Sequence, residues 1–234
     1  MNNELIINIA KETIKTEILG IKKITNIIDE NFSKIIRELS KVRGKVIFTG
    51  IGKSAHIARK ISSTMSSTGT PSIFIHSTEM SHGDLGVISK KDIIVIISNS
   101  GNSNELNGVI SFCKRNKIFT IGISSLKNSH LIKSSNMNLV IPITKEACSI
   151  GLAPTTSTSV ALVLGDAICI SLMSIKKFTT KDYRDIHPGG SLGESLIQVK
   201  KIMHKGKKIP LINENSSMKD AIIEITRKSF GHVG

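Results

Sequence analysis

Two polar segments of this chain have the composition of an anion-binding site. The segment TGIGKSAHIARK at 49–60 follows a short apolar run and begins a helical pattern, which places Lys53 and Ser54 at a helix N-terminus. The segment SNSGNSNE at 98–105 also follows an apolar run, and its hydroxyl groups belong to Ser98, Ser100 and Ser103. Clustered hydroxyls and free helical N–H groups suit a phosphate monoester, although the same residues also form ordinary helix caps.

The glycine spacing of the first segment does not establish a nucleotide site. Gly50, Gly52 and Ala55 match the Gly/Ala form of the dinucleotide fingerprint, but the expected acidic residue is missing, since His76 stands near its place. A nucleotide P-loop would need glycine at position 47, which is isoleucine. Two interpretations remain, an anion site at a Gly-rich turn and a plain tight turn with a solvated lysine.

Two further loops hold side chains that can transfer protons. KEACSIGLAPTTSTS at 145–159 contains Glu146, and DIHPGGSLG at 185–193 presents His187 on a turn fixed by Pro188 and two glycines. A loop carboxylate is often simply solvated, and a single loop histidine is often structural. The residue types alone therefore leave both roles open.

The segments that position these residues alternate in character along the chain. Short β-branched runs predict five strands, at 45–49, 72–76, 92–98, 118–124 and 138–143. Helical patterns are expected at 53–67, 104–116, 128–134 and 155–176. Apolar strands that alternate with helices are typical of a parallel sheet covered on both faces. The sequence therefore predicts an α/β three-layer sandwich, with ligands outside the carboxyl ends of its strands.

The two ends of the chain are expected to form additional pieces. Residues 3–42 alternate Ile and Leu with Lys and Glu, which predicts two amphipathic helices broken near Gly20. Toward the C-terminus the sequence changes to a Lys-rich linker, a short strand and a Ser-capped amphipathic helix. We expect N-terminal helices over 1–42, a sheet domain over 43–196 and a separate fragment over 197–234.

Charge and composition limit the classes of partner. Lys+Arg 32 and Asp+Glu 18 give a formal net charge of +14, which fits an anionic partner or a diffusely basic surface. Nucleic acid is disfavoured, because the basic residues are spread over every segment and one Tyr and no Trp are available for base stacking. The apolar stretch at 159–175 carries Asp166 and is shorter than the ~20 residues of a membrane span. With no CxxC pair and no apolar signal-peptide core, we expect a cytoplasmic protein that binds no membrane.

The same segments, in order, resemble the sugar isomerase (SIS) family and, within it, the arabinose 5-phosphate isomerases. The resemblance covers about residues 3–200 and is carried by GIGKSAHIARKISSTMSSTGTPSIFIHSTEMSHGDLG, SNSGNSNEL, KEACSIGLAPTTST and HPGGSLG. It implies the SIS fold and an aldose–ketose isomerase that interconverts D-ribulose 5-phosphate and D-arabinose 5-phosphate through an enediol. Asn102 and Asn104 depart from the family pattern and are expected to disturb the phosphate contacts slightly.

The resemblance implies a catalytic set of Lys53, Glu105, Glu146 and His187. Our hypothesis makes Glu146 the base that moves a proton between C1 and C2, with a pKa raised by burial toward neutrality. Lys53 would stabilise the enediolate, and His187 would assist proton transfer at the sugar oxygens. Glu105 is expected to orient Lys53 or to cap its helix.

Further expectations follow from the same resemblance. Ser54, Ser98, Ser100 and Ser103 would hold the phosphate, and Gly69, Thr70 and His82 match other substrate-contacting positions. His76 matches a position that can take an inhibitory zinc, although one histidine cannot make a zinc site. The isomerisation requires no metal or redox cofactor. Because the family forms homotetramers with active sites at subunit boundaries, we expect His82 and His187 to reach a neighbour's site.

The resemblance also bears on the C-terminal fragment, the pathway and the main alternative. The fragment resembles an incomplete first repeat of a cystathionine-β-synthase-type (CBS) pair. The family supplies 3-deoxy-D-manno-octulosonate synthesis for lipopolysaccharide. The alternative is a non-catalytic SIS module that senses a sugar phosphate. Such sensors usually carry a helix-turn-helix domain before the sheet, and residues 1–42 lack a convincing turn between short helices. A sensor would also not need Glu146 and His187 together.

Overall fold

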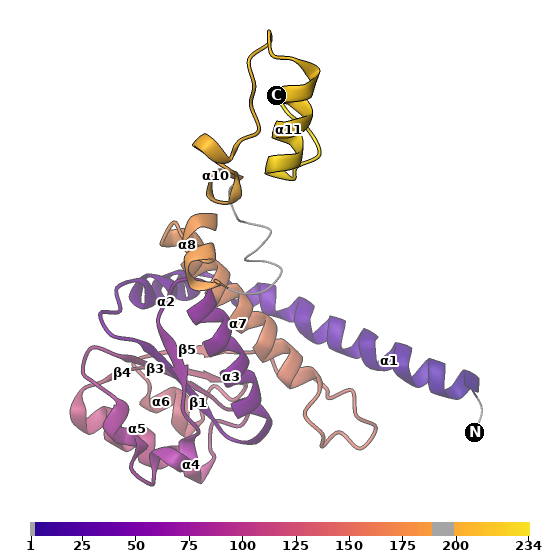
Figure 1. Ribbon diagram of the computed structural model, residues 1–234. Coiled ribbons are helices and arrows are strands. Elements are labelled where there is room, and N and C mark those ends of the chain that lie inside the picture. The colour runs from indigo at the N-terminus through magenta and orange to yellow at the C-terminus, as the bar shows by residue number, and fades with distance from the viewer. Residues whose placement is uncertain (1–2, 189–198) are drawn as a thin grey trace. The chain divides into compact units, whose positions relative to one another are not determined.

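A parallel sheet of five strands organises residues 1–186 (Figure 1). The strands are β1 (Val46–Gly50), β2 (Ser72–Phe74), β3 (Ile93–Ile97), β4 (Phe119–Ser124) and β5 (Met137–Val140), in the order β2-β1-β3-β4-β5. Each predicted β-branched run contributes one of them, and every pair is parallel, so the predicted sheet is confirmed. After β1 the chain adds β2 on one side and β3 on the other, which makes the carboxyl ends of β1 and β3 a topological switch point.

The computed structural model describes residues 3–188 and 199–234. Contacts divide the chain into two units, residues 1–186 and residues 187–234, and each unit is described by itself. The predicted boundary at 196/197 lies outside the described residues.

Helices cover both faces of the sheet and complete the predicted three-layer sandwich. One face packs against α2 (Glu30–Ser40), α3 (Gly52–Ser67) and α7 (Thr156–Ile175), and it carries the side chains of Phe48 and Val95. The opposite face packs against α4 (Ser77–Met80), α5 (Asn107–Asn116) and α6 (His130–Ser134), where Ile47 and Ile94 are buried. Consecutive strand residues thus enter two different cores, because side chains alternate across a strand. Short 3-10 turns, η2 (Asp84–Val87) and η3 (Asn104–Leu106), precede β3 and α5.

The N-terminal helix α1 (Asn3–Lys22) passes straight through Gly20, where the sequence predicted a break. Gly20 is buried, and a Cβ atom there would lie 2.4 Å from Cγ2 of Thr156 at the start of α7. The missing side chain therefore allows two helices to approach closely. The break between the two predicted helices comes later, at η1 (Lys23–Ile27), before Asp29 caps α2 through its side chain.

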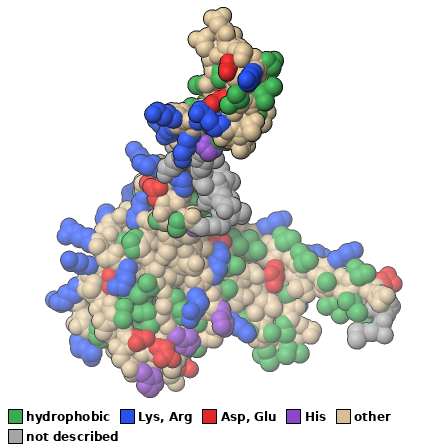
Figure 2. Space-filling view, in the orientation of Figure 1, with side chains coloured by type: hydrophobic (Ala, Val, Ile, Leu, Met, Phe, Trp, Pro, Cys, Tyr) green, Lys and Arg blue, Asp and Glu red, His purple; other side chains and the backbone are tan. Residues whose placement is uncertain are grey.

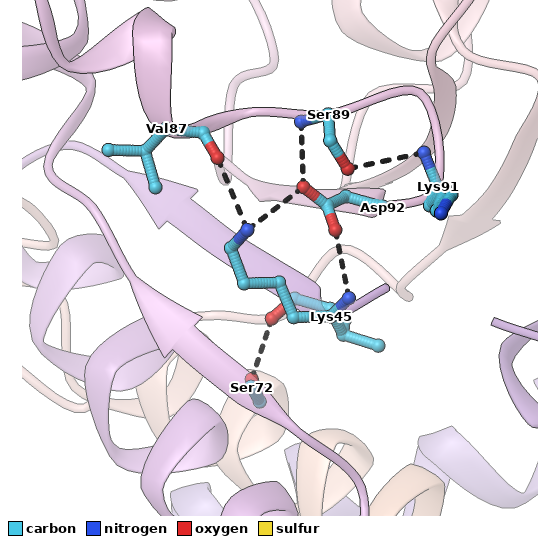
Figure 3. Close-up of polar contacts among 7 residues, drawn as sticks. Lys45, Ser72, Val87, Ser89, Lys91 and Asp92 are labelled. Carbon is cyan, nitrogen blue, oxygen red and sulfur yellow. Dashed lines mark hydrogen bonds and ion pairs between the residues drawn. The ribbon is translucent and has the colours of Figure 1, made fainter. Parts of the chain in front are cut away.

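The amino edge of the sheet is held by a buried carboxylate, Asp92, which is 3% exposed (Figure 3). Its Oδ1 accepts a hydrogen bond from Lys45 N at 2.9 Å, and its Oδ2 accepts from Ser89 N at 2.8 Å and from Lys45 Nζ at 3.1 Å. Lys45 Nζ also donates to the Val87 carbonyl. Gly44 is required beside this network, since a Cβ there would lie 2.1 Å from Asp92 Oδ1. The network joins the starts of β1 and β3.

Helix α7 confirms the long apolar helix expected over 155–176. By length and composition it is the one described helix that could cross a membrane. Val160, Leu164 and Cys169 on this helix are each fully buried in the core that it shares with α3 and the sheet. The helix then leads through Phe178 into α8 (Thr180–Ile186).

Residues 187–234 contain α10 (Val199–Ile202), η4 (Gly206–Lys208) and α11 (Met218–Lys228). Ser217 caps α11 in a capping box with Asp220, which confirms the predicted Ser-capped helix. The predicted short strand is not formed in the described part of this unit. The extended residues 210–212 instead exchange two backbone hydrogen bonds with Gly234, which is too short a pairing for a strand.

Candidate active site at the sheet switch point

A pocket of about 260 Å³ lies at the carboxyl ends of β1 and β3, where the strand order reverses. Five of the predicted site residues line it, namely Lys53, Ser54, Ser98, Ser100 and Ser103. The pocket is completed by the start of α7, through Pro154, Ser157 and Thr158. Residues from three separate loops therefore meet at the place that the topology of the sheet predicts.

The first wall of the pocket is the turn from β1 into α3. Gly50 permits a close approach to β3, since a Cβ there would lie 2.8 Å from the Ile97 carbonyl oxygen. Gly52 has a φ of +54°, a left-handed conformation that glycine adopts without strain. The N-cap residue of α3, Ile51, has no side chain that can accept a hydrogen bond. The first N–H groups of α3 are thus available to an anion, and Lys53 and Ser54 stand beside them.

The second wall is the serine loop after β3. Ser98 is buried, and its Oγ accepts a hydrogen bond from Gly101 N at 3.0 Å, while Ser100 Oγ accepts one from Asn102 N at 3.3 Å. Glycine is needed at 101, where φ is +64° and a Cβ atom would collide with the Ser124 and Ser129 hydroxyls. The Asn102 side chain accepts from His130 N at 2.8 Å, so this departure from the family pattern serves the start of α6 and does not line the pocket.

The third wall is the start of α7. Glu146 caps this helix start, but it is not itself one of the residues that line the pocket. Glu146 Oε2 accepts hydrogen bonds from Thr155 N at 2.8 Å, Thr155 Oγ1 at 3.1 Å and Ser157 N at 3.2 Å. Thr155 Oγ1 also accepts from Ala147 N at 2.9 Å, which fixes the hydroxyl between the two segments. The carboxylate therefore lies at a helix N-terminus, where a negative charge is stabilised. Oε1 accepts no hydrogen bond from any described residue.

The pKa of Glu146 is shifted in the direction opposite to our expectation. Burial acts to raise this pKa, but the donors of Ser157 and Thr155 outweigh burial and hold it below its ordinary value. The Ser157 hydroxyl lies near enough to contribute to this lowering, although it makes no hydrogen bond of normal geometry. The expectation of a raised pKa was wrong because the sequence did not reveal that the helix N-terminus turns back onto the carboxylate.

Comparison with known proteins identifies the family. The model of the SIS domain family matches residues 38–171, which include all five strands. The chain is 45% identical over 223 residues to arabinose 5-phosphate isomerase KdsD of Yersinia pestis, covering 95% of this chain and 68% of that protein. It is also 45% identical over 230 residues to the KdsD protein of Francisella tularensis, covering 97% of this chain and 70% of that protein.

A solved structure agrees with these relatives. A protein of Escherichia coli CFT073 in complex with arabinose 5-phosphate superposes with a TM-score of 0.78 at 39% identity, covering 80% of this chain and 100% of that chain. The chain belongs to the SIS family and, within it, to the arabinose 5-phosphate isomerases.

Several predicted site residues of this SIS protein lie away from the pocket. Glu105, in η3, is exposed and forms neither an ion pair with Lys53 nor a cap hydrogen bond in the described part of the chain. His82 is exposed after α4, and His76 caps α4 by accepting from Thr78 N through Nδ1. None of these three lines the pocket.

Gly69 and Thr70 lie at the other end of the sheet. They precede β2, so they stand at the amino edge, whereas the pocket is at the carboxyl edge. Gly69 packs against the Phe178 ring, which a Cβ atom would meet at 2.2 Å. Their predicted contact with substrate is therefore not made within the pocket of the same chain.

His187 belongs to the second unit, is half-buried and has interaction partners. The two glycines of its predicted turn, at 189 and 190, lie outside the described residues. Among residues 3–188 and 199–234, no group of three or more His, Cys, Asp and Glu side chains could hold a metal ion. A zinc ion at His76 would thus need ligands beyond those groups.

Ser157 is one of the polar pocket-lining residues that the sequence prediction missed, with Asn99 and Thr158. It lines the pocket and is 6% exposed. From the sequence, the run TTSTS at 155–159 was interpreted as a helix cap. In the structure, the loop that contains Glu146 folds back to the start of this helix, and the middle serine of the run, Ser157, lines the pocket. The signal was the spacing between Glu146 and a hydroxyl-rich helix start, which places both at one end of α7.

Proposed function

We propose that this chain interconverts D-ribulose 5-phosphate and D-arabinose 5-phosphate, as expected of an arabinose 5-phosphate isomerase. The observation that carries this is one pocket that combines a lysine, a loop of serines and the helix start that holds a carboxylate. An aldose–ketose isomerisation needs these three elements, since it requires a phosphate grip, a base and a donor for the developing oxyanion. The identity to the KdsD proteins supports the same conclusion.

The serine loop and the start of α3 would bind the phosphate. Ser54, Ser98, Ser100 and Ser103 converge on the pocket from two loops, and the N–H groups at the start of α3 lack an acceptor from their N-cap side chain. A phosphate monoester is satisfied by many donors with little demand on shape. Binding at this point would place C1 and C2 of the sugar toward α7.

Glu146 would act as the base through Oε1. Its Oε2 accepts the three hydrogen bonds from Thr155 and Ser157, which leaves Oε1 without a donor among the described residues. Glu146 does not itself line the pocket, so this role requires that the bound sugar extend from the pocket to Oε1. In D-arabinose 5-phosphate, Oε1 takes the proton from C2, and the C–H electron pair forms the C1–C2 double bond of the enediolate. Lys53 stabilises the negative charge on the C1 oxygen. Return of the proton to C1 and transfer of the C2 hydroxyl proton to the C1 oxygen, which His187 would mediate, give the ketose.

The remaining roles are part of the same proposal. His187 would exchange protons at the sugar oxygens, and Glu105 would tune Lys53 once substrate closes the site. All bond changes are proton transfers within one substrate, so the reaction requires no metal or redox cofactor. A zinc ion at His76 would be an inhibitor.

We propose a homotetramer with sites at subunit boundaries. The support is α1, whose apolar side chains lie along its surface (Figure 2). The exposed ones include Leu5, Ile6, Ile9 and Ile14. Exposed contiguous apolar surface on a helix is typical of a protein interface. A second copy is also the simplest way for Thr70 and His82 to reach a pocket that they do not line in their own chain.

The pathway, compartment and C-terminal unit complete the proposal. We propose that the product supplies 3-deoxy-D-manno-octulosonate for lipopolysaccharide, and that the protein acts in the cytoplasm on this phosphorylated sugar. The unit at 187–234 is proposed to be a CBS-like piece. In support, the alignment with the Francisella relative covers 97% of this chain and so extends into that unit.

The direct test is conversion of ribulose 5-phosphate by the purified full chain, followed by proton NMR. We expect arabinose 5-phosphate to appear until the two sugars reach equilibrium. Tight binding without turnover would contradict the isomerase and favour the sugar-phosphate sensor. Light scattering on the same sample tests the assembly, because an active monomer would contradict shared sites.

A further inference from the structure

One buried hydroxyl group in the pocket forms no hydrogen bond of normal geometry. Ser157 Oγ is buried and forms no hydrogen bond with any described residue, although its own N–H donates to Glu146. The other pocket hydroxyls differ. Ser98 Oγ accepts from Gly101 N, and Thr158 Oγ1 donates to the Thr155 carbonyl at 2.7 Å. Ser157 is therefore the only described pocket-lining side chain with a buried, unsatisfied polar atom.

An unsatisfied buried hydroxyl has a cost that requires an explanation. A buried donor without a partner destabilises a fold by about 1–3 kcal/mol, so native proteins rarely contain one. In a pocket, the missing partner can be an atom of the ligand. A hydroxyl that is unsatisfied in the free protein and faces the ligand space is thus expected to bind substrate.

The position of Ser157 indicates which part of the substrate it meets. Its N–H donates to Glu146 Oε2, so the serine and the carboxylate share one helix start. The hydroxyl also helps to lower the pKa of Glu146, although it forms no hydrogen bond of normal geometry with the carboxylate. A donor beside the base lies next to the carbon from which the base takes a proton. The phosphate grip is on the two other walls, in the serine loop and at the start of α3.

We propose that Ser157 Oγ donates a hydrogen bond to an oxygen of the C1–C2 enediolate. This inference rests on the proposed isomerase function, which it deepens. The negative charge that develops on that oxygen makes the hydrogen bond stronger in the transition state than with the bound sugar. Lys53 and Ser157 then stabilise the enediolate from opposite walls of the pocket.

The test compares Ser157→Ala with Thr156→Val in the full chain. Ser157→Ala is expected to lower kcat about 10²-fold with little change in KM, as for loss of one oxyanion donor. Its Tm should stay close to that of the wild type, because the lost hydroxyl forms no hydrogen bond of normal geometry. Thr156→Val removes an equally buried hydroxyl without a hydrogen bond from the same helix start, but Thr156 does not line the pocket, so its kcat should stay near the wild-type value.

Three outcomes would overturn the inference. The first is Ser157→Ala with wild-type kcat. The second is a loss of kcat that high pH restores in full, because the hydroxyl would then act only through the pKa of Glu146. The third is a loss of affinity for inorganic phosphate, measured as an inhibitor of Ser157→Ala, that is as large as the loss of kcat. Ser157 would then bind the phosphate group and not the enediolate. Failure of the proposed function is separate, since the wild type itself would then convert no ribulose 5-phosphate.

Discussion

Each edge of the sheet has a carboxylate that accepts hydrogen bonds from backbone N–H groups, but the two carboxylates serve different purposes. At the amino edge, Asp92 accepts from two backbone N–H groups and from Lys45 Nζ, and both of its oxygens are occupied. At the carboxyl edge, Glu146 also accepts from two backbone N–H groups, yet all of its donors fall on Oε2. Both carboxylates have a lowered pKa. The difference lies in the atoms left for a ligand. Glu146 Oε1 has no donor among the described residues, and the buried Ser157 hydroxyl forms no hydrogen bond of normal geometry.

Parallel topology explains why the open edge is the carboxyl edge. Every helix that follows a strand begins there, so its free N–H groups and positive dipole end point toward the same place. At the amino edge the helices end, and their exposed carbonyls do not attract an anion. At the amino edge, Asp92 joins the starts of two strands in a hydrogen-bond network that leaves no carboxylate oxygen for a ligand, and we call this the closed edge. The carboxyl edge keeps hydrogen-bond donors for a ligand, and we call it the open edge.

The largest expected effect comes from removing the open carboxylate. Glu146→Gln keeps an acceptor for the α7 N–H groups but removes the base, so kcat should fall about 10³-fold or more. Arabinose 5-phosphate should still bind, as isothermal titration can measure. A variant that keeps wild-type turnover would refute the assignment of Glu146 as the base.

The next effect concerns the cation of the open edge. Lys53→Met removes the charge that stabilises the enediolate, and kcat should fall about 10²-fold in the steady-state assay. Lys60→Met is the matched control on the same helix, since Lys60 forms a partly exposed pair with Asp166. Equal losses in the two variants would mean that Lys53 acts only through surface charge.

At the amino edge, neutralising the carboxylate of Asp92 should lower stability and leave catalysis intact. Asp92→Asn places an amide N–H₂ group against existing donors and leaves Lys45 without its anion, so the free energy of unfolding should fall by about 2–4 kcal/mol. Urea denaturation measures this loss. Turnover per folded molecule should match the wild type, and a selective loss of kcat would contradict the division between the edges.

The lowered pKa of Asp92 also fixes the sign of a pH dependence. Because the folded-state pKa lies below the ordinary 3.8, Asp92 adds stability above about pH 4 and loses this contribution as the pH falls through the folded pKa. Wild-type stability should therefore decline more steeply than that of Asp92→Asn at acidic pH. Parallel slopes in thermal unfolding from pH 5 to pH 3 would show that Asp92 is not stabilised by folding.

The smallest effect comes from the residue that positions Glu146. Thr155→Val removes one of three donors to Oε2, so the pKa of Glu146 should rise, and the acid limb of the kcat profile should move to higher pH with it. The change weakens activity at acidic pH and spares it at higher pH. Thr158→Val, whose hydroxyl does not touch Glu146, should leave the profile unchanged.

The sequence predicted the sheet and most helices because their signals are local. Runs such as DIIVIIS and KVIFT predict buried parallel strands, and the segment order places Lys53 and Ser98 at the same edge. The helix break predicted near Gly20 was placed too early, because a glycine within a helical pattern usually indicates a break. Here Gly20 instead allows a close approach to Thr156, which is far away in the sequence. Contacts between segments far apart in the chain leave no local pattern.

The site was predicted in part for the same reason. Lys53 and the serines follow their strands directly, so topology alone brings them together. The direction of the Glu146 pKa shift depends on a loop that folds back onto the start of α7. The residue types in this loop do not indicate that it folds back. The Asp92 network was not anticipated either, since Lys45 and Asp92 meet only through strand pairing.

The most direct test of the account is isomerisation in deuterated water by the wild type and Glu146→Gln. We expect the wild type to form arabinose 5-phosphate with deuterium at C2, because the base exchanges its proton with solvent. Glu146→Gln should bind the sugar phosphate and incorporate no deuterium. Deuterium incorporation at the wild-type rate by Glu146→Gln would contradict the claim that the open carboxylate at the start of α7 carries the chemistry.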